Sequence, residues 1–424
     1  MNFSNFLTAH TPLFYLLQPL WRDEAFSVFV ANPKDITTVL SQISNDFNPP
    51  LYYLILHFVI RTFGEGEVIL RLFSFIFHLG TSTLTYILFK KLFNKKTAVF
   101  AFIFTLLNPM LIYYGFELRM YSLYAFLAMA SMVSFLLKKR GLFILTSVLG
   151  LYTHSFFLLV LAGQFFYYAI RRKINKRTLT PFVLIFLLYI PWISTLIRQF
   201  GEAKVNWIFP VDLQLVKSVL GNLFTGYEGT PWYLWKITFY LSLIILAISI
   251  FQAKKARKGR ILPSIYILII LPLVLIYSIA RQPIFVNRYL IFVTVAEVIT
   301  IIWFIADMKN GKLKSASMIL TIMSVFLFNL WFADKHPKNN YRSMMANIWK
   351  NSSGKGLIMT DSISFFESYY YYPDRNKVFL YNPQKVTLPR YLGTSAIPND
   401  KMINKLPASD EIYLIHGDGT YDKK

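Results

Sequence analysis

Residues 138–173 read KKRGLFILTSVLGLYTHSFFLLVLAGQFFYYAIRRK, two basic clusters with no Asp, Glu, Lys or Arg between them. Short basic loops stay in the cytoplasm, so both ends are expected on the same side of a membrane, and the chain must cross it twice. Two passes leave about 15 residues each, or roughly 22 Å of helix, for a hydrocarbon core of about 30 Å. The turn at Tyr152-Thr153-His154 is therefore predicted to lie recessed, in a cavity of the outer leaflet.

The composition of the whole chain agrees with a membrane protein. Of its 424 residues 55% are hydrophobic and 18% aromatic, and the mean hydropathy is +0.46. A soluble protein of this length does not need so much apolar surface. Cysteine is absent, which excludes disulfides and thiolate metal sites.

Further stretches are apolar and long enough to span the bilayer. They are residues 68–89, 97–114, 120–137, 179–197, 232–251, 261–280, 289–306 and 316–332. With the paired segment they predict an all-α polytopic membrane protein with about 10–11 transmembrane helices.

The charge between the spans predicts their orientation. Five connectors together carry 20 basic residues and one acid, Asp307; they are residues 90–96, 138–140, 171–177, 254–260 and 307–314. These connectors are expected inside and the alternating loops outside. The net charge of +23 is thus explained mostly by topology, and binding to nucleic acid has little support.

The start of the chain allows several interpretations. Residues 3–20 are only mildly apolar. They could form a degenerate first span, an interfacial segment or the remnant of a longer helix, and no cleavable signal peptide is evident. In every case the parity of the later spans places Asp23 and Glu24 outside.

Two other outer segments are predicted to fold. The loop 198–231 contains apolar residues at helical spacing between 211 and 223, as in an interfacial amphipathic helix. The chain turns polar from Asp334, with expected strands at 356–360, 377–381 and 411–416, helices at 341–350 and 362–371, and an irregular part at 383–410. The expected domains are a transmembrane domain, 1–333, with its first outer loop at about 21–66, and a small extracytoplasmic α/β domain, 334–424.

The unusual polar residues all fall on the predicted outer face. Acidic residues number 21 against 44 basic ones, so adjacent carboxylates at a membrane edge suggest a functional site. The candidates are Asp23, Glu24, Asp46, Glu117, Arg119, Tyr121, His154, Arg288 and Tyr289. Carboxylates and arginines together suit a hydroxyl nucleophile and a phosphate leaving group.

Each candidate also has a structural explanation. Asp23 and Glu24 could be solvated loop carboxylates, and Glu117 and Arg119 a local ion pair. His154 could be a satisfied turn histidine, and Arg288 could snorkel to lipid headgroups. Two residues inside predicted spans complete the set: Arg71 is expected to snorkel, and Glu297 to face a packed polar partner. No GxGxxG, Walker, HExxH or Cys/His motif supports nucleotide or zinc chemistry.

At these residues the chain resembles a known family. The motifs are WRDEAFS (21–27), NPPLYY (48–53), IYYGFELRMY (112–121), LYTH (151–154) and VNRY (286–289). In this order they look like bacterial glycosyltransferase family 39, whose relatives include the protein O-mannosyltransferases and the aminoarabinose transferase of lipid A. The likeness covers roughly residues 20–375.

The resemblance implies a GT-C fold in the bacterial inner membrane and a polyprenyl-phosphate sugar donor. It implies that the Asp-Glu pair is the catalytic element, with Asp23 as the base, and that residues 51–63 form a juxtamembrane helix. It requires no cofactor, and a divalent metal that bridges Asp23 and the donor phosphate stays open. The chain departs from the family where a full first span normally precedes the Asp-Glu pair, which fits a truncated start. It also has Asn48 where many relatives have histidine.

The leading hypothesis is an inverting transferase that moves a sugar from a lipid phosphate to an acceptor hydroxyl, or to an amine or phosphate group, on the outer face. One alternative is a lipid or polysaccharide transporter, which would be expected to show internal repeats. Another is a catalytically inactive membrane assembly factor. Neither the sugar nor the acceptor (protein, lipid or glycan) follows from the sequence.

Overall fold

The computed structural model describes residues 8, 10–202, 208–254, 259–409 and 411–424. The chain forms two compact units. The first, which we call the helical unit, comprises Met1–Leu16, Arg71–Leu196 and Ile208–His336; the second, which we call the mixed unit, comprises Leu17–Leu70, Ile197–Trp207 and Pro337–Lys424. Residues of the predicted first outer loop thus belong to the same compact unit as the C-terminal segment.

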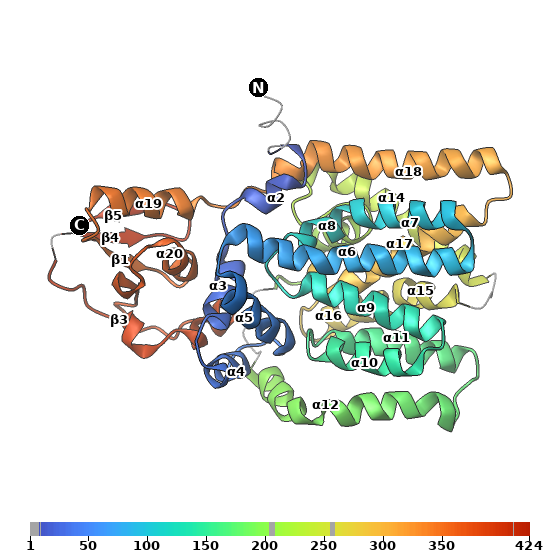
Figure 1. Ribbon diagram of the computed structural model, residues 1–424, viewed down its shortest axis with the longest axis horizontal. Coiled ribbons are helices and arrows are strands. Elements are labelled where there is room, and N and C mark those ends of the chain that lie inside the picture. The colour runs from blue at the N-terminus through green and yellow to red at the C-terminus, as the bar shows by residue number, and fades with distance from the viewer. Residues whose placement is uncertain (1–7, 9, 203–207, 255–258, 410) are drawn as a thin grey trace. The chain divides into compact units, whose positions relative to one another are not determined.

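Most helices of the helical unit lie in the predicted apolar stretches, and Figure 1 shows their arrangement. Up to residue 202 the helices of this unit are α2 (Leu13–Leu17), α6 (Glu67–Leu92), α7 (Lys95–Leu107), α8 (Pro109–Gly115), α9 (Tyr121–Leu136), α10 (Arg140–Leu151), α11 (Phe157–Ile170) and α12 (Lys176–Glu202). From residue 208 they are α13 (Leu213–Phe224), α14 (Trp235–Lys254), α15 (Ile261–Ile265), α16 (Leu271–Ala280), α17 (Ile291–Ala306) and α18 (Gly311–Phe332). Short 3-10 turns occur as η1 (Trp232–Leu234), η3 (Asn287–Leu290) and η4 (Ala333–Lys335). The π-helical segment η2 (Tyr266–Ile270) joins α15 to α16.

Not every predicted span is a full-length helix. Among the described residues six helices are long and apolar enough to cross a membrane, or seven if the bent pair α7 and α8 counts as one span. The other predicted crossings correspond to the shorter apolar helices α9, α10 and α11. The pair predicted between the basic clusters is confirmed as α10 and α11, and each rises only roughly 18–21 Å.

The break between α7 and α8 has a local cause. Asn108 has an extended backbone and its side-chain oxygen accepts the N–H of Leu111 at 3.1 Å, so it caps a new helix whose first residue is Pro109. Proline disfavours the helical conformation of the residue before it, and the axis turns by 62°. The short helix α8 then delivers the segment with Glu117 and Arg119 to the protein interior.

The core of the helical unit surrounds α17. Within the span that contains this helix 83% of the residues are buried, against 17% in the span of α18. Helix α17 contacts α7, α9, α13, α14, α15 and α18. By contrast α12, α14 and α18 expose large apolar side chains such as Ile190, Ile244 and Leu320, as expected of helices that face lipid.

The mixed unit combines three helices from the first outer loop with a small α/β part. The helices are α3 (Arg22–Ala31), α4 (Ile36–Ser44) and α5 (Leu51–Phe63), and α5 has the bounds that the family resemblance implied. The C-terminal part contains α19 (Tyr341–Asn351), α20 (Phe365–Tyr371), β1 (Leu357–Thr360), β2 (Val378–Tyr381), β3 (Met402–Ile403), β4 (Ile412–Ile415) and β5 (Tyr421–Lys423). Short turns occur as η5 (Arg375–Lys377), η6 (Arg390–Leu392), η7 (Thr394–Ala396) and η8 (Asn399–Lys401).

The sheet has the order β3-β2-β1-β4-β5, with only β5 antiparallel. The three predicted strands are confirmed as β1, β2 and β4, whereas β3 and β5 were not predicted. The part expected to be irregular holds the turns η6 to η8 and β3, and Asp410 lies outside the described residues.

Helix α3 packs against α5 and α20 within the mixed unit. The ring of Phe26 lies 5.2 Å from Phe366 and 6.4 Å from Tyr53. The ring of Phe29 lies 5.0 Å from Tyr369. These edge-on aromatic contacts fix the helix that carries the Asp-Glu pair against α5 and α20.

Candidate active site

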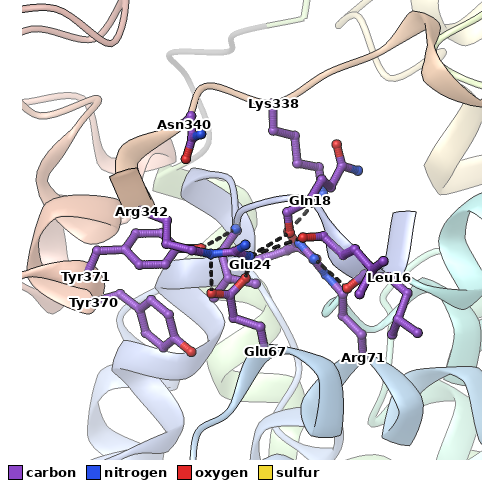
Figure 2. A network of polar contacts seen from close by, with 12 residues as sticks. Leu16, Gln18, Glu24, Glu67, Arg71, Lys338, Asn340, Arg342, Tyr370 and Tyr371 are labelled. Atoms are coloured by element: carbon purple, nitrogen blue, oxygen red, sulfur yellow. Dashed lines mark hydrogen bonds and ion pairs between the residues drawn. The ribbon is translucent and has the colours of Figure 1, made fainter. Parts of the chain in front are cut away.

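The first turn of α3 carries Asp23 and Glu24. Glu24 is fully buried, accepts the backbone N–H of Trp21 at 3.2 Å and pairs with the ammonium group of Lys338 at 2.8 Å (Figure 2). A carboxylate at this position satisfies a free N–H of the helix start and interacts favourably with the helix dipole. Glu24 is thus a buried, charge-paired anchor of the helix start and not a solvated loop carboxylate.

Asp23, one residue earlier, remains partly accessible. Its side chain is 16% exposed, and one carboxylate oxygen accepts from Nε and Nη2 of Arg22 at 3.1 and 3.0 Å. The Arg22 guanidinium keeps this carboxylate oriented while one face stays open to solvent. Of the adjacent pair, Asp23 is the residue that an incoming molecule can reach.

A carboxyl group that the sequence did not single out lies near Asp23. Glu367 of α20 is 5% exposed, and burial raises its pKa to about 8, with Arg22 lowering the pKa and Asp23 and Asp361 raising it further. Its Oε2 has no hydrogen-bond partner among the described residues. Glu367 is therefore mainly protonated at neutral pH.

Asp46 follows α4 and is also buried. Its carboxylate accepts from the side-chain amide of Asn48 at 2.6 Å, and its backbone carbonyl from Gln199 at 2.5 Å. Asn48 therefore donates a hydrogen bond to Asp46. This arrangement fits a structural role for Asp46 in the mixed unit.

A network of polar contacts ties the residues on either side of the first outer loop to the α/β part of the mixed unit (Figure 2). Arg342 of α19 pairs with Glu67 and donates to the carbonyls of Leu17 and Gln18 at 3.2 and 3.3 Å. The hydroxyl oxygen of Tyr371 accepts the N–H of Leu20 at 2.6 Å. These contacts fix the chain immediately before α3.

The remaining candidates belong to the helical unit, where aromatic rings gather around His154. This ring stacks on Tyr124 at 4.7 Å and lies 6.0 Å from Tyr121 and 5.4 Å from Tyr289. Its Nδ1 accepts the N–H of Phe156 at 3.1 Å, as a turn histidine would. The structure thus brings three of the candidate residues, His154, Tyr121 and Tyr289, together.

Charged residues adjoin this aromatic cluster. Arg119 and Arg288 are both buried, and both act electrostatically on His154. Arg288 donates from Nη1 to Glu228 at 3.3 Å, and Glu228 also accepts from the hydroxyl of Tyr114. Glu117, likewise buried, interacts electrostatically with Tyr114. Two buried arginines thus lie close to one histidine in the described interior of the helical unit.

Two expectations about charged groups, for Arg71 and Glu297, are wrong, and the alternative that Arg288 snorkels is not supported. Arg288 is 6% exposed and ion-paired, so it does not snorkel. Arg71 is fully buried and donates to the carbonyl of Leu16 at 3.1 Å (Figure 2). Glu297 is fully buried too, but neither carboxylate oxygen has a hydrogen-bond partner among the described residues. The position of a charged residue along a span does not show whether neighbouring elements bury its side chain in the folded protein.

The donor set for a metal is sparse. The described residues contain no group of three or more His, Asp or Glu side chains that could hold a metal ion. The carboxylates of Asp23 and Glu24 are paired with Arg22 and Lys338, respectively.

The sequence comparisons identify a related family over part of the chain. No curated protein sequence matches this chain. Residues 48–197 match the family model described as dolichyl-phosphate-mannose-protein mannosyltransferase.

Solved structures resemble almost the whole chain. ArnT from Cupriavidus metallidurans in the apo state aligns with a TM-score of 0.59 at 12% identity, covering 93% of this chain and 87% of that one. The same protein bound to undecaprenyl phosphate gives a TM-score of 0.57 at 12% identity, with the same coverage of both chains. The apo oligosaccharyltransferase of Archaeoglobus fulgidus gives 0.52 at 10% identity, covering 86% of this chain and 62% of that one. The fold is thus the GT-C fold found in ArnT, as predicted, and residues 48–197 are similar to the mannosyltransferase family.

Proposed function

We propose that this protein is a membrane glycosyltransferase that moves a sugar from a polyprenyl-phosphate donor to an acceptor on the outer face of the bacterial inner membrane. The observation that carries the proposal is the buried pair Arg119 and Arg288 beside His154 in the helical unit. A similar fold has been solved with undecaprenyl phosphate bound, in ArnT. A hydroxyl is the simplest acceptor for this chemistry, with an amine or a phosphate group as the other choices.

In this mechanism Arg288 binds the donor phosphate, with Arg119 as a second, weaker contact. Guanidinium groups match phosphate oxygens bidentately and stay charged at any working pH. They would stabilise the negative charge that gathers on the phosphate as the bond between the anomeric carbon and the phosphate oxygen breaks. Tyr121, His154 and Tyr289 would line the donor site.

Asp23 accepts the proton of the acceptor hydroxyl as its oxygen attacks the anomeric carbon. The polyprenyl phosphate leaves with the bonding electron pair, and direct displacement inverts the anomeric configuration. Glu24, buried and paired with Lys338, cannot take the same role and instead orients the helix start. General-base catalysis of this kind contributes about 10²–10⁴-fold to the rate.

The first test is mass spectrometry of lipids that co-purify with the protein. A polyprenyl-phospho-sugar in the wild type, whose amount falls in an Arg288 variant, supports the proposed donor. A transporter would be expected to carry lipid-linked cargo without consuming it, so donor consumption by purified protein in cell envelopes separates the two functions. An inactive assembly factor would bind the lipid without turnover.

The proposed orientation predicts a labelling pattern. Single cysteines can be placed at Lys176, in a basic connector, and at Asn399, in the C-terminal part of this cysteine-free chain. In intact cells an impermeant thiol reagent should label Asn399→Cys and spare Lys176→Cys, because short basic loops stay in the cytoplasm. Both should react after permeabilisation. The reverse pattern would place the C-terminal part inside and contradict the mechanism.

The ion pair between Arg288 and Glu228 yields a second prediction. Because the Glu228 side chain is 29% exposed, its ion pair with Arg288 contributes at most about 1 kcal/mol. A donor phosphate that binds Arg288 competes with this ion pair. Glu228→Gln should therefore tighten undecaprenyl phosphate binding up to about fivefold, as measured by titration of the purified protein. Asp212→Asn, in the same outer loop, serves as a control. Weaker binding in Glu228→Gln would mean instead that Glu228 holds Arg288 in its binding orientation.

A further inference from the structure

Lys338 lies in the segment between η4 and α19, far in sequence from α3. Its ammonium group is 2.8 Å from the carboxylate of Glu24, with the two side chains 7% and 0% exposed. The same group lies 5.8 Å from the centre of the Trp21 ring. One buried lysine thus contacts the first and last residues of the Trp21–Glu24 motif.

An ion pair between two buried side chains, as between Lys338 and Glu24, is unusual. Lysine is rarely buried, and an ion pair removed from water gains little stability over apolar side chains of the same size. A charge-assisted hydrogen bond does, however, hold its partner in a preferred orientation, because the N–H must point at the acceptor oxygen. Glu24 also accepts the Trp21 N–H, so its carboxylate connects Lys338 to the start of α3.

The segment that carries Lys338 is itself anchored in the mixed unit. The hydroxyl of Tyr341, three residues on, donates to the carbonyl of His416 at 3.0 Å, just after β4. Arg342 pairs with Glu67 (Figure 2). The backbone of Lys338 is therefore set by the C-terminal α/β part.

We infer that Lys338 is a positioning residue, which holds Glu24 and through it the turn of α3 that presents Asp23. The inference rests on the proposed function, since it concerns how the base of that reaction is placed. It gives the C-terminal α/β part a direct role in transfer. A shift of about 1 Å in a reacting group can cost roughly 10²-fold in rate.

The test uses the purified full-length chain added to cell envelopes that lack it, with the loss of polyprenyl-phospho-sugar followed by mass spectrometry. Lys338→Met should lower turnover by roughly 10²-fold, while undecaprenyl phosphate binding stays within about twofold of the wild type. Lys338→Arg should recover part of the turnover. Lys335→Met removes a nearby lysine that is 44% exposed and should change neither property.

A second variant separates positioning from stability. In Glu24→Gln/Lys338→Met no charge is left unpaired, so thermal stability should recover while turnover stays low. Recovery of turnover together with stability would overturn the inference, as would wild-type turnover in folded Lys338→Met. No donor consumption by the wild-type protein would overturn the proposed function and the inference with it.

Discussion

Asp23→Asn should abolish sugar transfer, with turnover falling by about 10²–10⁴-fold. The substitution keeps the shape of the side chain and removes its ability to take a proton. Asp23 is partly exposed, and its contact with Arg22 is a near-surface ion pair, so the variant should fold. Turnover is measured as consumption of polyprenyl-phospho-sugar in cell envelopes, and undecaprenyl phosphate binding should be unchanged.

Asp400→Asn is a matched control, since it neutralises an exposed carboxylate of η8 in the same mixed unit. It should transfer sugar at the wild-type rate. If Asp23→Asn turned over at a near-wild-type rate, the carboxylate would be structural and Asp23 would not be the base. Glu367→Gln, measured in parallel, shows whether the protonated neighbour contributes.

Much of the fold could be predicted from the sequence because it depends on local patterns. Apolar stretches between basic clusters predicted the helices from α6 to α18, and alternating apolar residues predicted β1, β2 and β4. The helical spacing between residues 211 and 223 predicted α13. Strands β3 and β5 were missed because they have two and three residues and form only by pairing with neighbours.

The candidate site was predicted less completely, since its partners are distant in sequence. His154, Tyr121 and Tyr289 were named as candidates from their motifs, and the rings of the two tyrosines lie 6.0 and 5.4 Å from that of His154. Glu228 and Lys338 were not, although they pair with Arg288 and Glu24. Glu228 lies in a glycine-rich turn and Lys338 in a polar linker, and neither segment contains a recognisable motif.

The errors have the same physical origin. Snorkelling was expected for Arg71 from its place near a span end, but only tertiary structure shows that the carbonyl of Leu16 lies within its reach. Desolvation of a charged group is costly, so a group buried by folding either finds a partner or becomes neutral. The sequence shows where such groups occur, and only the fold shows how each is satisfied.

Arg288→Ala should weaken binding of undecaprenyl phosphate by roughly 10–150-fold, because a charge-assisted contact to phosphate is worth about 1.5–3 kcal/mol. Arg288→Lys should recover only part of this loss, since an ammonium group cannot bind two phosphate oxygens in the planar, bidentate way of a guanidinium. Binding is measured by titration of the purified protein with undecaprenyl phosphate.

The control variant must account for Glu228, which loses its arginine partner in Arg288→Ala. Arg288→Ala/Glu228→Gln removes both charges, so any loss of stability caused by the unpaired carboxylate should disappear while the loss of binding remains. Arg281→Ala, an exposed arginine shortly before η3, should bind like the wild type. Unchanged affinity in Arg288→Ala would remove this residue from the donor site and leave Arg119 as the candidate, because it is the other buried arginine that acts on His154.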